Sequence, residues 1–98
     1  MNGPICAAIR SRHLLEFDYE GRPRIVEPYC HGFTRTGEAL RGIQVGGESR
    51  SAGFGFGKLW LVSRMENVRV IERRFPADDP HYNPDDSAML SIHCRVQR

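Results

Sequence analysis

The amino-acid sequence predicts a mainly β protein: a small barrel of about five strands with an N-terminal helix and a short C-terminal helix or extension. Three observations predict this class. Several short segments alternate apolar and polar residues with a period of two, as half-buried strands do. Turns that contain glycine or proline separate these segments. Gly42 interrupts one of them, as curved sheets require. Closing such a sheet removes most of its exposed edges, so a barrel is favoured over a flat sheet.

The first element is a predicted helix over residues 4–12. Ile5, Ala8 and Ile9 recur at helical spacing, and Pro4 suits the first helical position. A helix this short is marginal in isolation, so we expect it to dock on the rest of the chain.

Residues 15–19 and 24–27 are predicted to be two strands of a hairpin. Leu, Phe and Tyr alternate with acids in the first segment, and a turn containing Gly21 and Pro23 follows it. Pro28 lacks the backbone N–H that a strand ladder needs. The second strand is therefore expected to end or to bulge at Pro28.

Residues 39–45 are predicted to form a third strand, in which Arg41 shares a face with Ile43 and Val45. An arginine among core-facing residues requires a buried carboxylate, a ligand in a pocket, or a position at the rim where its head reaches water. Gly42 in mid-strand predicts sharp curvature or a close backbone approach.

The segment 46–57 is predicted to be a loop, because five of its twelve residues are glycine. Its Phe54 and Phe56 are interpreted as covering the barrel mouth, with exposed stacking or partner-docking groups as the alternative. Residues 59–62 and 68–72 are expected to be two further strands. The tail leaves two readings open. Residues 83–86 are typical of a helix start, with Asn as the cap and Pro in the first position, whereas residues 91–96 fit a last strand.

With 98 residues the chain is expected to be one domain, with residues 1–75 as the barrel and 76–98 as an extension packed on it. No apolar run approaches the roughly 20 residues that cross a bilayer, and no signal segment is seen, so a cytoplasmic protein is expected. Cys6, Cys30 and Cys94 are widely spaced and odd in number, which favours buried free thiols over a disulfide framework.

No cofactor, metal site or catalytic residue is predicted, and the protein is expected not to be an enzyme. The four histidines lack metal-ligand spacing, and neighbouring His93 and Cys94 would point apart in a strand. Cys30 and His31 are adjacent, which is poor geometry for a base that activates a thiol.

The order of the strands resembles a WYL domain, the small Sm- or SH3-like barrel of bacterial transcriptional regulators. The matching segments run from residue 5 to Phe75: 5–9, 15–19, 24–28, 39–44 and Lys58-Leu59-Trp60-Leu61-Val62-Ser63-Arg64-Met65. Leu40-Arg41-Gly42-Ile43-Gln44 and Tyr82 to Asp86 are similar to segments of a group of short, stand-alone bacterial WYL-like proteins. Two features depart from the family pattern. Glu38-Ala39-Leu40 replaces the Trp-Tyr-Leu trio, and only four residues precede the matching helical segment 5–9, so no helix-turn-helix domain is expected.

The resemblance implies a non-enzymatic, ligand-sensing or regulatory module that binds a nucleotide-like effector or single-stranded nucleic acid. The positions that map to its basic, aromatic patch are Arg24, Arg41 and Arg64, with Tyr19 for stacking. Forked guanidinium donors suit phosphate, and an aromatic ring beside them suits a base. The same arginines can instead pair with neighbouring acids in a solvated shell. The alternative function is a protein-interaction or oligomerising module, with a homodimer as the simplest assembly.

Overall fold

The computed structural model describes residues 3–48 and 57–97. The described elements are one helix, six strands and a single 3-10 turn. In chain order they are α1 (Gly3–Ser11), β1 (His13–Tyr19), β2 (Arg22–Thr34), β3 (Gly37–Gly47), β4 (Lys58–Leu61), η1 (Val62–Arg64), β5 (Met65–Arg74) and β6 (Ser91–Arg95). The prediction of a mainly β fold with an N-terminal helix is confirmed, and the strand count is six rather than about five. Most of the predicted 46–57 loop, including Phe54 and Phe56, lies outside the described residues.

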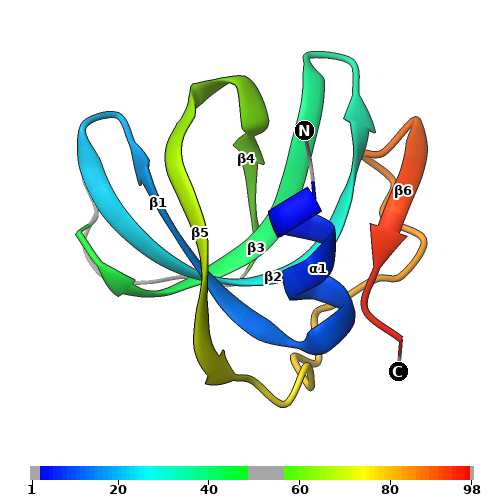
Figure 1. Cartoon of the computed structure of the whole chain (residues 1–98). Coiled ribbons are helices and arrows are strands. Elements are labelled where there is room, and N and C mark those ends of the chain that lie inside the picture. Colours follow the sequence, from blue (N-terminus) through cyan, green and yellow to red (C-terminus); the bar gives the residue numbers. More distant parts are fainter. Residues whose placement is uncertain (1–2, 49–56, 98) are drawn as a thin grey trace.

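All six strands belong to one antiparallel sheet in the order β4-β3-β2-β1-β5, with β6 added to β2. The long β2 uses one edge twice: residues 22–26 pair with β1, and residues 30–33 pair with β6. The sheet is strongly curved, and α1 lies between β5 and β6 (Figure 1). The pairings of the described residues leave the sheet open, with β4 and β5 at its two ends and η1 joining them.

The predicted hairpin of β1 and β2 is confirmed, with Tyr19 opposite Arg22. Glu20 and Gly21 form its two-residue turn, and both have positive φ, as the turns that match strand twist require. At Pro28 the strand does not end. The register with β3 shifts between Pro28 and Cys30, which is the bulge that the proline predicts.

The core forms where α1 and the concave side of the curved sheet meet. Ile5, Ala8 and Ile9 are all at most 2% exposed, so the predicted apolar face of the helix is the docked one. Trp60 packs edge-to-face on Phe17, with ring centroids 5.4 Å apart. At Gly42 a Cβ atom would lie 3.1 Å from the Glu27 carbonyl oxygen and 2.5 Å from Val26 Cγ1, so the predicted close approach to a neighbouring backbone is confirmed.

The predicted helix start at residues 83–86 is wrong; this part of the tail forms turns and the chain then enters β6. Asn83 Oδ1 accepts a hydrogen bond from the Asp85 N–H, two residues on, and Asp86 Oδ1 accepts one from the Ala88 N–H. Such local bonds favour turns over a helix. The Leu90 N–H then donates to the β2 backbone, which leads into the strand alternative for residues 91–96.

The prediction that all three cysteines are free thiols is wrong for two of them. Cys6 and Cys94 form a disulfide that links α1 to β6, although 88 positions separate them in the sequence. Spacing along the chain could not reveal this pair, because the docking of α1 beside β6 brings it together. Cys30 is free and buried. Among the described residues, no helix has the length and apolar character needed to cross a membrane.

Candidate functional site

The predicted basic patch is divided between two places. Tyr19, Arg24 and Arg64 come together at the β1–β2 hairpin, where the guanidinium groups lie 5.8 and 5.6 Å from the Tyr19 ring centroid. Arg41 lies elsewhere, under the C-terminal tail. The four predicted residues therefore do not form a single site.

Arg24 belongs to the core rather than to the surface. Its side chain is 2% exposed and donates to the Tyr19 carbonyl at 3.0 Å and, more weakly, to Gln44 at 3.4 Å. The Glu20 carboxylate, 3.6 Å away, balances its charge. A cation enclosed in this way supports the aromatic core and is not presented to a ligand in solution.

Arg64 is the exposed member of the hairpin cluster. Its side chain is 54% exposed and lies over the Tyr19 ring, with a long 3.4 Å contact to Glu20. Tyr19 itself is only 9% exposed, and its hydroxyl accepts a hydrogen bond from the Leu61 N–H. This surface thus offers one accessible guanidinium and little aromatic area for stacking.

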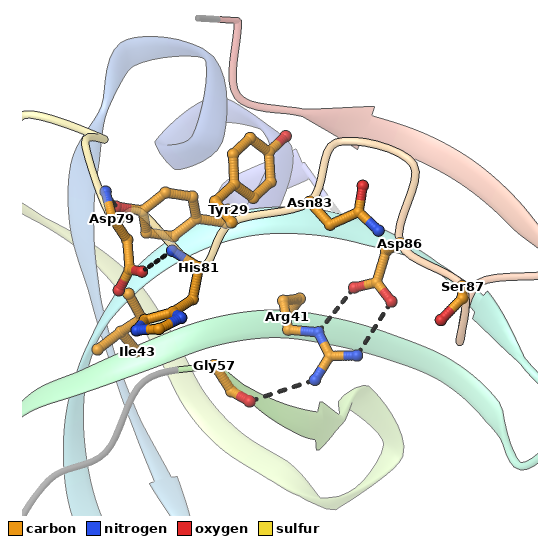
Figure 2. Close-up of a pocket in the computed structure, with 10 residues that line it drawn as sticks. Tyr29, Arg41, Ile43, Gly57, Asp79, His81, Asn83, Asp86 and Ser87 are labelled. Atoms are coloured by element: carbon orange, nitrogen blue, oxygen red, sulfur yellow. Dashed lines mark hydrogen bonds and ion pairs between the residues drawn. The ribbon is translucent and has the colours of Figure 1, made fainter.

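Arg41 is held by Asp86 in a bidentate ion pair. Its Nε and Nη2 donate to the two carboxylate oxygens at 2.7 and 3.0 Å, and its Nη1 donates to the Gly57 carbonyl at 3.2 Å. Figure 2 shows these bonds joining β3 to the tail. The hydrogen bond from Arg41 lowers the pKa of Asp86, and the same bond raises the pKa of Arg41. Of the three options for this arginine, a buried carboxylate is the one observed.

Beside this ion pair is a cavity of about 200 Å³, lined among others by Tyr29, Ile43 and Tyr82. Figure 2 shows Arg41 at its wall, with Asp79 and His81 on the tail opposite. Asp79 and Asp86 are the carboxylates that line it, and Asp86 is paired with Arg41. Asp79 also contributes, after burial and Asp78, to the raised pKa of Glu27. A ligand with negative charge would meet repulsion here, so the cavity suits a small neutral or cationic group better.

A second, more open groove of about 750 Å³ lies between the end of α1 and β6. Arg10, Arg12, His93 and Arg95 line it, together with Ile92, Cys94 and Gln97, and no carboxylate is among the lining residues. Arg10 is exposed and engages no partner within the described residues. Arg95 is 40% exposed, and its carboxylate contact is with Asp85, which is itself 88% exposed.

Sequence reasoning missed this groove because its arginines are far apart in the chain. Arg10 lies in the last turn of α1 and Arg12 directly follows the helix, whereas Arg95 lies in β6, a segment that the sequence allows to be either helix or strand. The one available signal was the pair of arginines in the last turns of an otherwise apolar helix, which by itself fits the ordinary preference for cations at a helix C-terminus.

The same corner of the molecule gathers two sulfurs and two imidazoles. Cys6 Sγ lies 3.6 Å from His93 Nδ1 and 3.9 Å from His31 Nδ1, and the two Nδ1 atoms are 3.2 Å apart. With Cys94 Sγ, the four atoms all lie within 4.8 Å of one another. The prediction that His93 and Cys94 point apart is wrong, because the pairing of β2 with β6 shifts register beside them. With the two sulfurs reduced to thiols, these four residues could hold a metal ion.

Cys30 does not take part in such chemistry. Burial is the main cause that raises the pKa of its thiol to about 11, so it stays protonated near neutral pH.

Comparisons of the chain with protein-family models, with curated proteins and with solved structures find no match. The resemblance to WYL domains therefore rests only on the sequence segments between residue 5 and Phe75 and on the segment 82–86.

Proposed function

We propose that this protein is a non-enzymatic binding module of WYL type whose ligand carries phosphate, either a nucleotide-like effector or a short single strand of nucleic acid. The strand order supports the related proposal that the sheet belongs to the Sm- or SH3-like barrels. β4 and β5 are the terminal strands of the sheet and are consecutive in the chain, joined by one 3-10 turn. Bringing them side by side would close the curved sheet into a barrel.

The basic groove is the observation that carries the proposal. Three guanidinium groups, those of Arg10, Arg12 and Arg95, line one concavity that no carboxylate lines. Their charges add in a hollow where the protein limits screening by water, so the potential is positive over a region wide enough for a phosphate group. Guanidinium donors match phosphate oxygens in both charge and geometry.

The residues mapped by the resemblance support binding less directly. Arg24 is enclosed, Arg41 is neutralised by Asp86, and Arg64 is the accessible member. We therefore propose the groove as the anion site and assign Arg24 and Tyr19 to the support of the fold. Arg64 stays a candidate for a second phosphate contact at the other end of a longer ligand.

Fluorescence anisotropy of a labelled oligothymidylate, repeated over a range of salt concentrations, tests the proposal on the disulfide form of the full chain. We expect salt-dependent binding that Arg10→Ala and Arg95→Ala each weaken. Each lost phosphate contact should reduce the slope of log affinity against log salt by about 0.7. Arg73→Ala is the matched control: an exposed arginine of β5 outside the groove, whose removal changes the net charge equally. Equal losses in the control and groove variants, or the absence of salt-dependent binding to oligonucleotide, ATP and GTP alike, would refute the assignment.

One surface favours the alternative, an interaction module. Leu90 is 70% exposed and Phe33 is 45% exposed, and the two residues are joined by a backbone hydrogen bond. Exposed apolar neighbours of this size are typical of contact surfaces. Light scattering of the wild type and of Leu90→Ser tests whether a dimer forms through this surface. A dimer that Leu90→Ser dissociates would support the interaction module, and a monomer at high concentration would count against it.

A further inference from the structure

We propose that Cys6, His31, His93 and Cys94 form a tetrahedral Zn²⁺ site in the reduced protein, and that the Cys6–Cys94 disulfide is the metal-free, oxidised state of the same site. The inference is independent of the anion-binding proposal. It rests on the positions of four ligand atoms and on the carboxylate behind one of them.

Three of the distances between the ligand atoms match those of a zinc tetrahedron. With Zn–N of about 2.05 Å and Zn–S of about 2.3 Å, tetrahedral geometry places two nitrogens about 3.3 Å apart and a nitrogen and a sulfur about 3.6 Å apart. The observed Nδ1–Nδ1 distance is 3.2 Å, and Cys6 Sγ lies 3.6 and 3.9 Å from the two nitrogens. Cys94 Sγ lies within 4.8 Å of the other three atoms, and its edge to Cys6 Sγ is shortened by the covalent bond.

Glu38 supplies the outer contact that metal-binding histidines usually make. Its carboxylate lies 2.6 Å from His31 Nε2, so the ring proton is placed on Nε2 and the Nδ1 lone pair faces the sulfurs. A carboxylate that binds the distal N–H of a ligating histidine fixes the ring and increases its basicity. Glu38 occupies the position at which WYL domains carry Trp. At this site the replacement of Trp by Glu supplies the carboxylate that contacts His31.

The site would join three parts of the chain and has a route to solvent. Cys6 comes from α1, His31 from β2, and His93 and Cys94 from β6, with Cys94 directly opposite His31 in the sheet. His31 and Cys94 are buried, whereas His93 is exposed and borders the basic groove. A metal ion can therefore enter beside His93 without unfolding of the core.

The two states interconvert by balanced chemistry. A dithiol reductant donates two electrons and two protons; the Sγ–Sγ bond breaks, two thiols form, and the reductant becomes a cyclic disulfide. Zn²⁺ then displaces the two thiol protons and binds two thiolates and two neutral imidazoles. The resulting centre has no net charge, which suits its largely buried position. A set of two sulfur and two nitrogen ligands favours zinc among the common divalent ions.

Cobalt titration of the full chain tests the inference. The protein is reduced with a phosphine, freed of reductant under anaerobic conditions and titrated with Co²⁺ alone. We expect the visible bands of tetrahedral cobalt and a thiolate-to-cobalt charge-transfer band, saturating at equimolar metal and lost when Zn²⁺ is added. Glu38→Gln should keep the spectrum and weaken affinity about 10- to 100-fold.

Two variants separate a metal site from the proximity of a disulfide. His93→Asn alters an exposed side chain, so it should fold and yet show weaker cobalt binding with shifted bands. Cys30→Ser removes the third thiol and should leave the spectrum unchanged. Absence of charge transfer in reduced wild type would overturn the inference, as would a wild-type spectrum in His93→Asn.

Discussion

The ion pair between Arg41 and Asp86 holds the C-terminal tail on the sheet, so removing Arg41 should cost the fold much of its stability. Arg41→Ala deletes two charge-assisted hydrogen bonds to Asp86 and one bond to the Gly57 carbonyl. It leaves an aspartate that is 8% exposed with the Ala88 N–H as a remaining donor. Leaving this buried carboxylate without its cation should lower the unfolding free energy more than the loss of the hydrogen bonds themselves.

The magnitude follows from the burial of the pair. Breaking a fully buried ion pair costs about 3–5 kcal/mol. Because the Arg41 side chain is 28% exposed, water can replace part of the lost interaction. We therefore expect about 2–3 kcal/mol of lost unfolding free energy, which lowers Tm by roughly 10–20 °C in a domain of this size.

Arg95→Ala is a matched control within the same tail. It also breaks an Arg–Asp pair, but the partners are 40% and 88% exposed and 3.4 Å apart, and the only other bond lost among the described residues is an exposed one to the Pro84 carbonyl. Exposed pairs of this kind contribute about 0–1 kcal/mol. Urea unfolding followed by circular dichroism gives both values, and hydrogen exchange at the Ala88 amide shows whether the tail detaches first. Losses for the two variants that agree within about 0.5 kcal/mol would refute the reasoning, because burial would then not distinguish them.

Three further predictions concern pH and packing. The hydrogen bond from Arg41 lowers the pKa of Asp86 in the folded protein. The ionised Asp86 therefore stabilises the fold above pH 3.8, the ordinary aspartate pKa, and this contribution is lost as pH falls through the folded pKa. In thermal melts, the difference in stability between wild type and Asp86→Asn should shrink over that fall in pH. Burial is the main cause that raises the pKa of Glu27, so the charged form of this residue destabilises the fold above that pKa. Glu27→Gln should therefore raise Tm at neutral pH. Below pH 4.5, the ordinary glutamate pKa, the substitution should have no effect. A stabilising effect of Glu27→Gln that persists at low pH would exclude charge as its cause. Gly32→Ala should lower the unfolding free energy by about 1–3 kcal/mol, because the new Cβ would lie 2.1 Å from the Ser91 carbonyl oxygen of β6. Gly3→Ala is the control: its Cβ would meet nothing within 4 Å, so this change should be neutral. Equal Tm values for the two variants would show that β6 moves aside freely.

The sequence determined the local elements, because their signals lie in neighbouring residues. Alternation identified the hairpin strands, and the spacing of Ile5, Ala8 and Ile9 identified the docked helix face. Pro28 marked a bulge, and Gly42 marked a close backbone contact. The need of Arg41 for a partner also followed from its position in a strand, although its partner could not be named.

Only the tertiary structure decided which distant residues meet. The sequence around Asp86 is typical of a helix start, yet the residue pairs with Arg41. The spacing of Cys6 and Cys94 is typical of unrelated thiols, yet the two form a disulfide. The basic groove and the sulfur–imidazole cluster both arise where the end of α1 lies beside β6. Periodicity along a chain specifies which face of an element is buried, but it contains no information about which face of another element will cover it. That choice depends on how the curved sheet places α1 and β6 together, so the sites made between them could not be read from the sequence.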